Sequence, residues 1–155
     1  MCERTYLMRA VIQRVAKASV QCDDGHQSSI GKGYLILLGI GHEDNEENCA
    51  KLWQKIKKLR IFPDAEGKIN LDLATVNGEV LIVSQFTLFA DTRKGNRPSF
   101  INAAHPQLGE RLYEYFVELA RRDVPVVGTG SFGAMMDVSL VNSGPFTIIL
   151  DTDNM

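Results

Sequence analysis

The sequence predicts an α+β fold, a mainly antiparallel sheet or distorted β-barrel with two amphipathic helices. About seven or eight segments have the alternating or continuously apolar pattern of strands, whereas only two segments have helical periodicity. The strand-like segments do not alternate one for one with helices, as they would in a doubly wound parallel sheet.

Length and composition indicate one domain. The chain has 155 residues, of which 45% are hydrophobic and 23% are charged, and this is enough for a core without disulfides. We expect residues 1–7 to be an unpatterned N-terminal extension and residues 8–155 to form a single domain.

Composition also argues against several classes of protein. The three cysteines are an odd number without a CxxC pair or a signal peptide, which indicates reduced thiols in a cytoplasmic protein. The longest apolar run, Tyr34–Ile40, is too short to span a membrane. The net charge of −2 argues against general nucleic-acid affinity, DNA included, but it permits a local basic site for one end of an RNA. The three histidines are far apart in the sequence and no Cys/His spacing fits a zinc site, so we expect no metal site. We also expect no cofactor.

The first half of the chain contains strands and one helix. Residues 8–15 and 17–22 have the composition of strands, and residues 26–30 return after a turn at Asp23-Asp24-Gly25. Tyr34–Ile40 is expected to be a central strand covered on both faces. A helix then begins at an Asp44 or Asn45 cap, and its apolar residues recur at helical spacing: Cys49, Leu52, Trp53, Ile56 and Leu59.

The second half contains two predicted hairpins. Asn77-Gly78 is the strongest hairpin signal and would join a strand at 69–76 to a long strand at 79–89. A second helix is expected at 106–122, with Leu108, Leu112, Phe116 and Leu119 on its apolar face.

After that helix we expect a short strand, Pro125–Val127, and a glycine-rich loop at 128–133. The loop resembles G-x-G-x-x-G, but a strand and not a helix follows it, which argues against a dinucleotide site. The final hairpin joins strands Met136–Val141 and Phe146–Leu150.

Two polar stretches are unusual for the segments that contain them. Ser84-Gln85-Phe86-Thr87 follows the apolar run Leu81–Val83 and is either a strand leaving the core or a functional site. In Asn142–Thr147, Gly144 precedes Pro145, so a residue with nearly free φ meets one with fixed φ and no N–H. That unit is either a surface turn or a rigid piece of main chain that can approach a ligand closely.

A basic loop at 90–99 carries Arg93, Lys94 and Arg97, with Phe89 and Phe100 on either side. Cations beside aromatic rings suit a single-stranded nucleotide end, although a solvated loop has the same composition.

No conventional hydrolase motif is present in the sequence. There is no G-x-S-x-G elbow, and neither Ser84 nor Thr87 has a histidine or an acid close in sequence. Cys2, Cys22 and Cys49 are expected to be buried or incidental thiols.

At these residues the sequence resembles the D-aminoacyl-tRNA deacylase family. The run VSQFTLFADTRKGNRPSF is similar to the family's Ser-Gln-x-x-Thr motif and the loop after it, and VNSGPFT is similar to its Asn-x-Gly-Pro-x-Thr motif. The segments MRAVIQRV, KIKKLRIFPD, GKINL and TGSFGA also match, so the resemblance covers residues 8 to about 151. Met135 departs from the small polar or acidic residue of many members. Ser84-Gln85 agrees with the main family and not with a chordate paralogue of relaxed chirality.

The resemblance implies a homodimeric hydrolase that cleaves the ester between a D-amino acid and the 3′-terminal adenosine of tRNA. Glycine mischarged onto alanine tRNA is an implied second substrate. Gly144-Pro145 would be a cis peptide that projects into the partner subunit's pocket, where its carbonyls bind the substrate's α-amino group. An L side chain would collide with this rigid main chain, whereas a D side chain or a hydrogen would not. The implied partners are aminoacyl-tRNA and a second copy of the chain, with no membrane and no DNA.

The resemblance also implies roles for individual residues. Backbone N–H groups around Gln85–Thr87 would stabilise the oxyanion, and the 2′-hydroxyl of the RNA would activate water. Arg14 would support the Gly-Pro unit, and Phe132 and Met136 would pack on the terminal adenine. The implied catalytic residues are Ser84, Gln85, Phe86 and Thr87, and the implied substrate-binding residues are Gly144, Pro145, Asn142, Thr147, Arg14, Phe132 and Met136.

Three alternatives remain open at this point. Thr87 itself could be the nucleophile or base, although a lone hydroxyl needs an adjacent base. The protein could be a non-catalytic module that binds RNA ends, or a small-ester hydrolase that uses Ser84 or Thr87.

Overall fold

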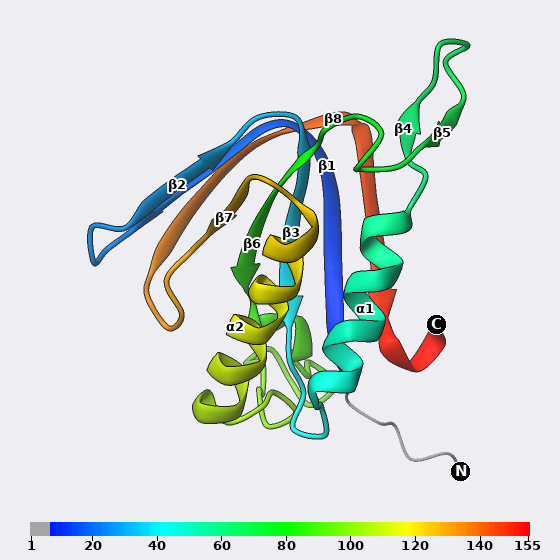
Figure 1. Ribbon diagram of the computed structural model, residues 1–155. Helices are drawn as coiled ribbons and strands as arrows, with labels where there is room; N and C mark the ends of the chain where they lie inside the picture. Colours follow the sequence, from blue (N-terminus) through cyan, green and yellow to red (C-terminus); the bar gives the residue numbers. More distant parts are fainter. Residues whose placement is uncertain (1–6) are drawn as a thin grey trace.

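A computed structural model describes residues 7–155, which form a strongly curved sheet with two α-helices against one face (Figure 1). The predicted extension at 1–7 lies outside the described residues, except for Leu7. The main sheet has the order β2-β1-β3-β6-β7, and β8 pairs with β1. Its strands are β1 (Arg9–Cys22), β2 (Gln27–Ile30), β3 (Gly33–Gly39), β6 (Glu79–Ser84), β7 (Val127–Thr129) and β8 (Met136–Asp151).

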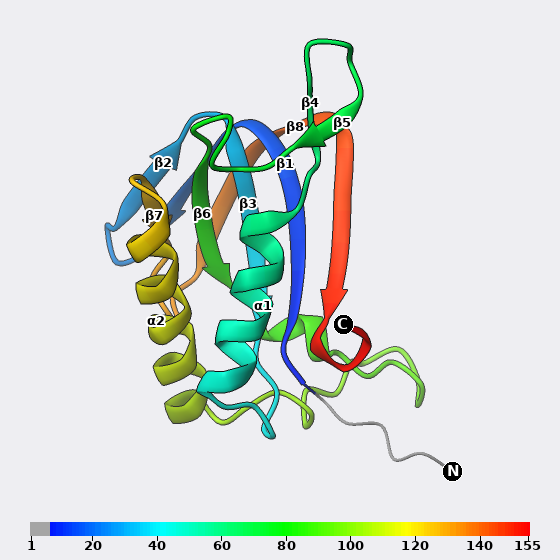
Figure 2. The same cartoon turned by 45° about the vertical axis from the view of Figure 1, so that its right-hand side comes forward.

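The helices α1 (Glu46–Lys58) and α2 (Pro106–Asp123) lie side by side on the sheet (Figure 2). Asn45 caps α1, because its side chain accepts a hydrogen bond from the Asn48 N–H at 3.0 Å. Pro106 occupies the first turn of α2, where its missing N–H costs no hydrogen bond. The smaller elements are β4 (Phe62–Pro63), β5 (Ile69–Leu71) and the 3₁₀ helices η1 (Phe86–Phe89) and η2 (Thr152–Asn154).

The sheet curls because β1 changes neighbours along its length. Its first half lies between β3 and β8, and its second half lies between β2 and β8. At the bend, Gly33 has φ +157° and approaches Glu79 so closely that an added Cβ would lie 1.8 Å from the Glu79 carbonyl oxygen. Only glycine fits at this crossing point. The curved, nearly closed sheet and the two helices confirm the predicted α+β class with a barrel-like sheet.

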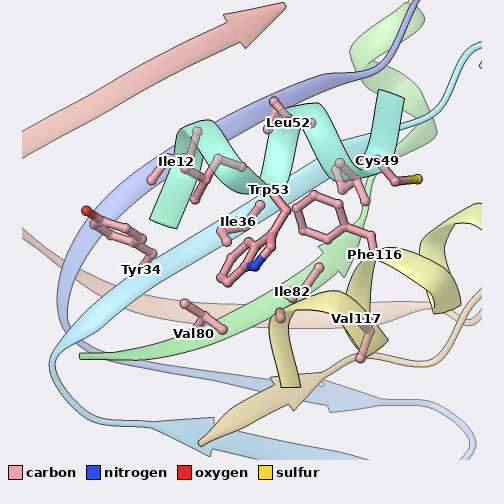
Figure 3. Packing of buried hydrophobic residues seen from close by; sticks show 14 of the residues in the cluster. Ile12, Tyr34, Ile36, Cys49, Leu52, Trp53, Val80, Ile82, Phe116 and Val117 are labelled. Carbon is pink, nitrogen blue, oxygen red and sulfur yellow. The ribbon is translucent and has the colours of Figure 1, made fainter. Parts of the chain in front are cut away.

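Two apolar clusters fill the two sides of the curved sheet. Trp53 of α1 and Phe116 of α2 meet edge to face over the sheet, with ring centroids 5.7 Å apart (Figure 3). The second cluster lies on the opposite face and includes Val20, Leu35 and Leu81. Because both faces of β3 are covered, its continuous apolar run is explained, and the prediction of a central strand at 34–40 is confirmed.

The Asn77-Gly78 hairpin prediction is wrong. β5 pairs with β4, and β6 pairs in parallel with β3 and β7. Asn77 has φ 52°, so the residues do form a tight turn, but the turn lies inside a loop. The reason is burial: Val80–Val83 of β6 are buried on both faces, which requires a position in the middle of the sheet.

The prediction of a final hairpin is also wrong. Residues 136–151 form the single strand β8, and β1 is likewise one strand and not two. The pairing of β8 with β1 shifts register between Gln13 and Val15, where Gln13 faces Thr147 and Val15 faces Asn142. Four residues, 143–146, therefore bulge out opposite Arg14 alone. A local pattern of polar, Gly and Pro residues between apolar runs suits a turn and a bulge equally well.

Other boundaries also differ from the predictions. The strand predicted at 69–76 ends at Leu71. The strand predicted at 79–89 ends at Ser84, because the chain turns into η1. The strand predicted at 125–127 lies at Val127–Thr129.

Asp44 fixes the start of the sheet and the start of α1. It is 6% exposed and accepts hydrogen bonds from Met8 N–H at 2.9 Å, Gly41 N–H at 2.7 Å and Asn48 Nδ2 at 2.9 Å. Burial raises the pKa of this carboxyl group, although the three donors favour its ionised form.

We expect Asp44→Ala to lower the free energy of unfolding by about 3 kcal/mol, because it leaves two buried backbone donors without an acceptor. Asp44→Asn keeps one acceptor oxygen and should cost only about 1 kcal/mol. Urea denaturation of the two variants measures both values, and equal losses would contradict this role.

Candidate functional site

The four residues Ser84-Gln85-Phe86-Thr87 lie where β6 ends. Ser84 pairs with Leu38 of β3, and the Gln85 N–H continues the ladder by donating to the Leu38 carbonyl at 2.8 Å. The chain then turns into η1, which leaves Phe86 and Thr87 exposed at the surface. The polar stretch therefore begins where the strand leaves the core, and its exposed position is also compatible with the functional site that the sequence left open.

The turn leaves two backbone donors available. The Leu38 carbonyl accepts from Gln85, but the N–H groups of Phe86 and Thr87 have no acceptor among residues 7–155. They belong to the first turn of η1, where N–H groups have no partner within the helix. Two neighbouring donors without acceptors can stabilise a negative oxygen of a bound molecule.

Arg9 of strand β1 holds η1 in place. Its Nη1 donates to the Leu88 carbonyl at 3.2 Å, and its Nε donates to Asp151 Oδ2 at 3.0 Å. The guanidinium also lies over the Phe89 ring, 5.1 Å from the centroid. Arg9 is not among the residues predicted for the site, because its role depends on the fold bringing residues 9, 88 and 151 together.

The chemistry available to side chains here is limited. The Thr87 hydroxyl accepts a hydrogen bond from Gln85 Nε2, and no histidine or carboxylate among the described residues is bonded to it. Burial raises the pKa of Cys49 to about 12, so this thiol is not a ready nucleophile. No cluster of three potential metal ligands occurs within residues 7–155. None of the described helices combines the length and apolarity needed to cross a bilayer.

The loop after β7 lies at the same edge of the sheet. Strands β6 and β7 are parallel, so their carboxyl ends meet there, and the Gly130 N–H donates to the Ile82 carbonyl at 3.4 Å. Phe132 lies against Tyr113 of α2 and lines a cavity of about 380 Å³ with Gly130. Met136 does not line this cavity. It packs into the second apolar cluster, and its sulfur would lie 2.4 Å from a Cβ at Gly130.

Arg14 of the paired strand β1 supports the bulge in β8. Its Nε donates to the Ser143 carbonyl at 2.9 Å, its Nη1 donates to the Ile61 carbonyl at 2.5 Å, and its guanidinium lies 4.7 Å from the Phe146 ring centroid. The Gly144-Pro145 peptide is cis, as the resemblance implies, and both residues are exposed.

Asn142 and Thr147 close the bulge at its base. The Asn142 side chain accepts from the Phe146 N–H at 2.6 Å and donates to Thr147 Oγ1 at 3.0 Å. Gln13 Nε2 donates to the same oxygen at 3.5 Å. The bulge is thus held at its base by Asn142 and Thr147 and from the neighbouring strand by Arg14, while Gly144 and Pro145 project from it.

One chain does not bring the two motifs together. The bulge lies opposite Arg14, whereas Ser84 pairs with Leu38, which pairs with Ala10. These two positions are four residues apart on β1, about 13 Å along the strand. The structure therefore places the segment 84–87 near Phe132 at the carboxyl ends of β6 and β7, whereas Gly144, Pro145 and Arg14 lie in the middle of the β1–β8 pair.

Comparisons with known proteins identify the family of this chain. Residues 11–151 match the family described as D-Tyr-tRNA(Tyr) deacylase. A D-aminoacyl-tRNA deacylase of Thermotoga petrophila is 51% identical over 148 residues, which cover 96% of this chain and 99% of the relative. A D-aminoacyl-tRNA deacylase of Dehalococcoides mccartyi is 53% identical over 145 residues, which cover 94% and 95% of the two chains.

Two solved structures are similar in fold. The c-Myc DNA Unwinding Element Binding Protein is 40% identical, with a TM-score of 0.85 over 92% of this chain and 97% of that chain. A probable eukaryotic D-amino acid tRNA deacylase is 18% identical, with a TM-score of 0.79 over 92% and 98% of the two chains, and it supports the fold alone. Given the sequence match from residue 11 to residue 151 and the identities above 50%, this chain belongs to the D-Tyr-tRNA(Tyr) deacylase family.

Proposed function

We propose that this protein hydrolyses the ester bond between a D-amino acid and the 3′-terminal adenosine of tRNA. Membership of the family and relatives named D-aminoacyl-tRNA deacylase support a hydrolase of this kind. The observation that carries the proposal is the pair of unused N–H groups at Phe86 and Thr87, in an exposed turn without a side-chain triad. The reaction would take place in the cytoplasm, where charged tRNA is used.

In this proposal the two N–H groups bind the carbonyl oxygen of the ester. Attack of water turns that oxygen into an oxyanion, and donors already in position stabilise the developing charge. Gln85 contributes through its side chain, which bonds Thr87, and not through its N–H, which the sheet occupies. The attacking water is activated by the 2′-hydroxyl of the RNA, so no protein base is needed.

The main chain of Gly144 and Pro145 distinguishes the D form of the substrate from the L form. The carbonyls of Gly144 and Pro145 bind the α-amino group of the substrate, which leaves space on the D side only. Selectivity then arises from a collision with the L side chain, and this requires a wall that does not move. The hydrogen bonds that Arg14 donates to Ser143 and that the Phe146 N–H donates to Asn142 support such rigidity. Glycine has no side chain to collide with this main chain, so glycine mischarged onto alanine tRNA is a second proposed substrate.

The adenine of the terminal nucleotide would lie near Phe132. The ring lines the cavity beside α2 at the sheet edge that also carries Gln85–Thr87. Met136 contributes through its contact with Gly130 behind the loop.

We propose a homodimer in which each site combines two chains. Within one chain the bulge lies about 13 Å along the sheet from the segment 84–87. The Gly144-Pro145 unit, called the wedge below, must therefore come from a second copy. Exposed apolar side chains on β8 support an interface there, including Ile149 at 73% exposure and Val141 at 46%.

Complementation tests this arrangement. Gly144→Ala damages the wedge and Phe86→Pro removes one of the unused N–H groups, so each variant alone should be nearly inactive. After co-expression, half of the dimers are mixed and each mixed dimer has one intact site, which predicts about a quarter of the parent activity. Activity that stays at the level of the separate variants would show that the site is built within one chain.

The function itself is tested by incubating the purified protein with D-Tyr-tRNA and measuring released tyrosine. We expect multiple turnovers. Saturable tRNA binding without release would instead indicate a module that binds RNA ends. Labelling of Ser84 or Thr87 by an acyl-phosphonate would indicate a conventional esterase.

Thr87→Ala separates the two chemical mechanisms. The proposal needs the backbone N–H of residue 87 and not its hydroxyl, so kcat should fall by no more than about threefold. Thr87→Ser is the matched control, because it keeps the hydroxyl. A loss above about a hundredfold in the alanine variant alone would make the Thr87 hydroxyl a catalytic group.

A further inference from the structure

The loop after η1 carries a positive surface that the proposed catalytic groups do not use. Residues 91–99 hold three cations and one acid, in a chain whose net charge is −2. Asp91 and Ser99 form an antiparallel bridge with N–O distances of 2.8 and 2.9 Å, which closes the loop at its base. The Ala90 N–H donates to the Thr87 carbonyl at 3.0 Å, so the loop begins at a fixed place beside the candidate site.

Only part of this charge is neutralised by the protein. Arg93 donates to Asp91 through Nε at 3.0 Å and Nη2 at 2.8 Å. Lys94 and Arg97 are exposed, and neither forms a hydrogen bond or an ion pair with another described residue. Two exposed cations that form no hydrogen bond or ion pair with the described part of the chain, on a closed loop, make a local site for anionic groups.

An aromatic pair connects this loop to the candidate catalytic segment. The rings of Phe86 and Phe100 meet edge to face with centroids 5.1 Å apart, and Phe86 is 56% exposed. Phe86 precedes Thr87, and Phe100 directly follows the loop. Figure 2 shows the loop extending from the end of the sheet at which β6 passes into η1. Cations next to an exposed ring bind single-stranded nucleic acid through phosphate contacts and base stacking.

We propose that Lys94 and Arg97 bind the backbone phosphates of the unpaired nucleotides that precede the terminal adenosine of tRNA. The exposed Phe86–Phe100 pair supports one of their bases. This inference rests on the proposed function, because the aminoacyl ester must lie at Phe86 and Thr87 for those nucleotides to reach the loop. The loop would thus provide a local binding site for one RNA end in a protein whose net charge is negative.

The test compares Lys94→Gln/Arg97→Gln with Lys51→Gln/Lys55→Gln. Both double variants remove two positive charges from exposed side chains, and the second pair lies on the outer face of α1. We expect the loop variant alone to lower kcat/KM for D-Tyr-tRNA about tenfold in moderate salt. The plot of log kcat/KM against log salt should become shallower by about 1.4, or 0.7 for each lost phosphate contact to a single strand.

Two further measurements separate this inference from the proposed function. The D-tyrosyl ester of adenosine has no upstream phosphates, so the loop variant should hydrolyse it at the parent rate. An uncharged RNA ending in CCA should bind about tenfold more weakly to the loop variant than to the α1 variant, whether or not turnover occurs. A parent inactive on both esters would refute the proposed function. Equal losses in the two double variants, equal RNA binding, or an equal loss on the adenosine ester would overturn the loop as a phosphate site.

Discussion

Phe86→Pro should lower kcat for D-Tyr-tRNA by about 10²- to 10³-fold, the usual effect of removing one donor to an oxyanion. Proline has no N–H, so the change removes one of the two donors that the fold leaves unused. Residue 86 is the first residue of η1, a position that tolerates proline. Gln85 before it has φ −140° and ψ 79°, which lies outside the helical region that proline disfavours for the preceding residue.

Phe86→Ala is the matched control for that variant. It also loses the aromatic ring and its contact with Phe100, but it keeps the backbone N–H. Its kcat should stay within about tenfold of the parent value, since only the stacking contact is lost. Steady-state kinetics on one charged tRNA give both values. If the alanine and proline variants are equally impaired, the ring and not the N–H is responsible.

Gly144→Ala should lower kcat/KM for D-Tyr-tRNA by about a hundredfold. Gly144 has φ +136°, a conformation that L residues with a Cβ rarely adopt. An added Cβ would lie 2.8 Å from Arg14 Nη2 and 3.1 Å from the Phe146 backbone nitrogen. The variant therefore displaces the Arg14 guanidinium and moves the Gly144 and Pro145 carbonyls. A displacement of about 1 Å at a positioning group is enough for such a loss.

Gly67→Ala controls for the backbone strain. Gly67 also has positive φ, +78°, but a Cβ there would meet nothing within 4 Å. Both variants should lose about 1–2 kcal/mol of stability for the left-handed conformation. Only Gly144→Ala should lose activity. If Gly67→Ala loses as much activity, the effect is on stability, and the role of the wedge is unsupported.

The sequence predicts the elements whose signals are local. The Asn45 cap and the apolar spacing of Cys49, Leu52 and Trp53 correctly give α1. The continuous apolar run at 34–40 correctly gives the buried strand β3. These patterns are decided by residues a few positions apart, and the structure agrees with them.

Features that depend on distant residues were not predictable. A Gly-Pro pair between apolar runs fits a hairpin, and only the pairing of β8 with β1 shows that it is a bulge. The parallel pairing of β6 likewise depends on β3 and β7, which the turn at Asn77-Gly78 does not indicate.

The candidate site shows the same division. The polar residues at 84–87 were visible in the sequence, but the availability of the Phe86 N–H depends on where β6 ends. Arg9 has no local signal at all, because its three contacts come from residues 88, 89 and 151.

The central claim is that a fixed piece of main chain accepts one mirror image of the substrate. The most direct test is the initial rate of deacylation of D-Tyr-tRNA and L-Tyr-tRNA, prepared from the same tRNA, by the parent protein. We expect kcat/KM for the D ester to exceed that for the L ester by at least about a hundredfold, since the L side chain would meet main chain that Arg14 and Asn142 hold in place. Equal rates on the two esters would contradict it.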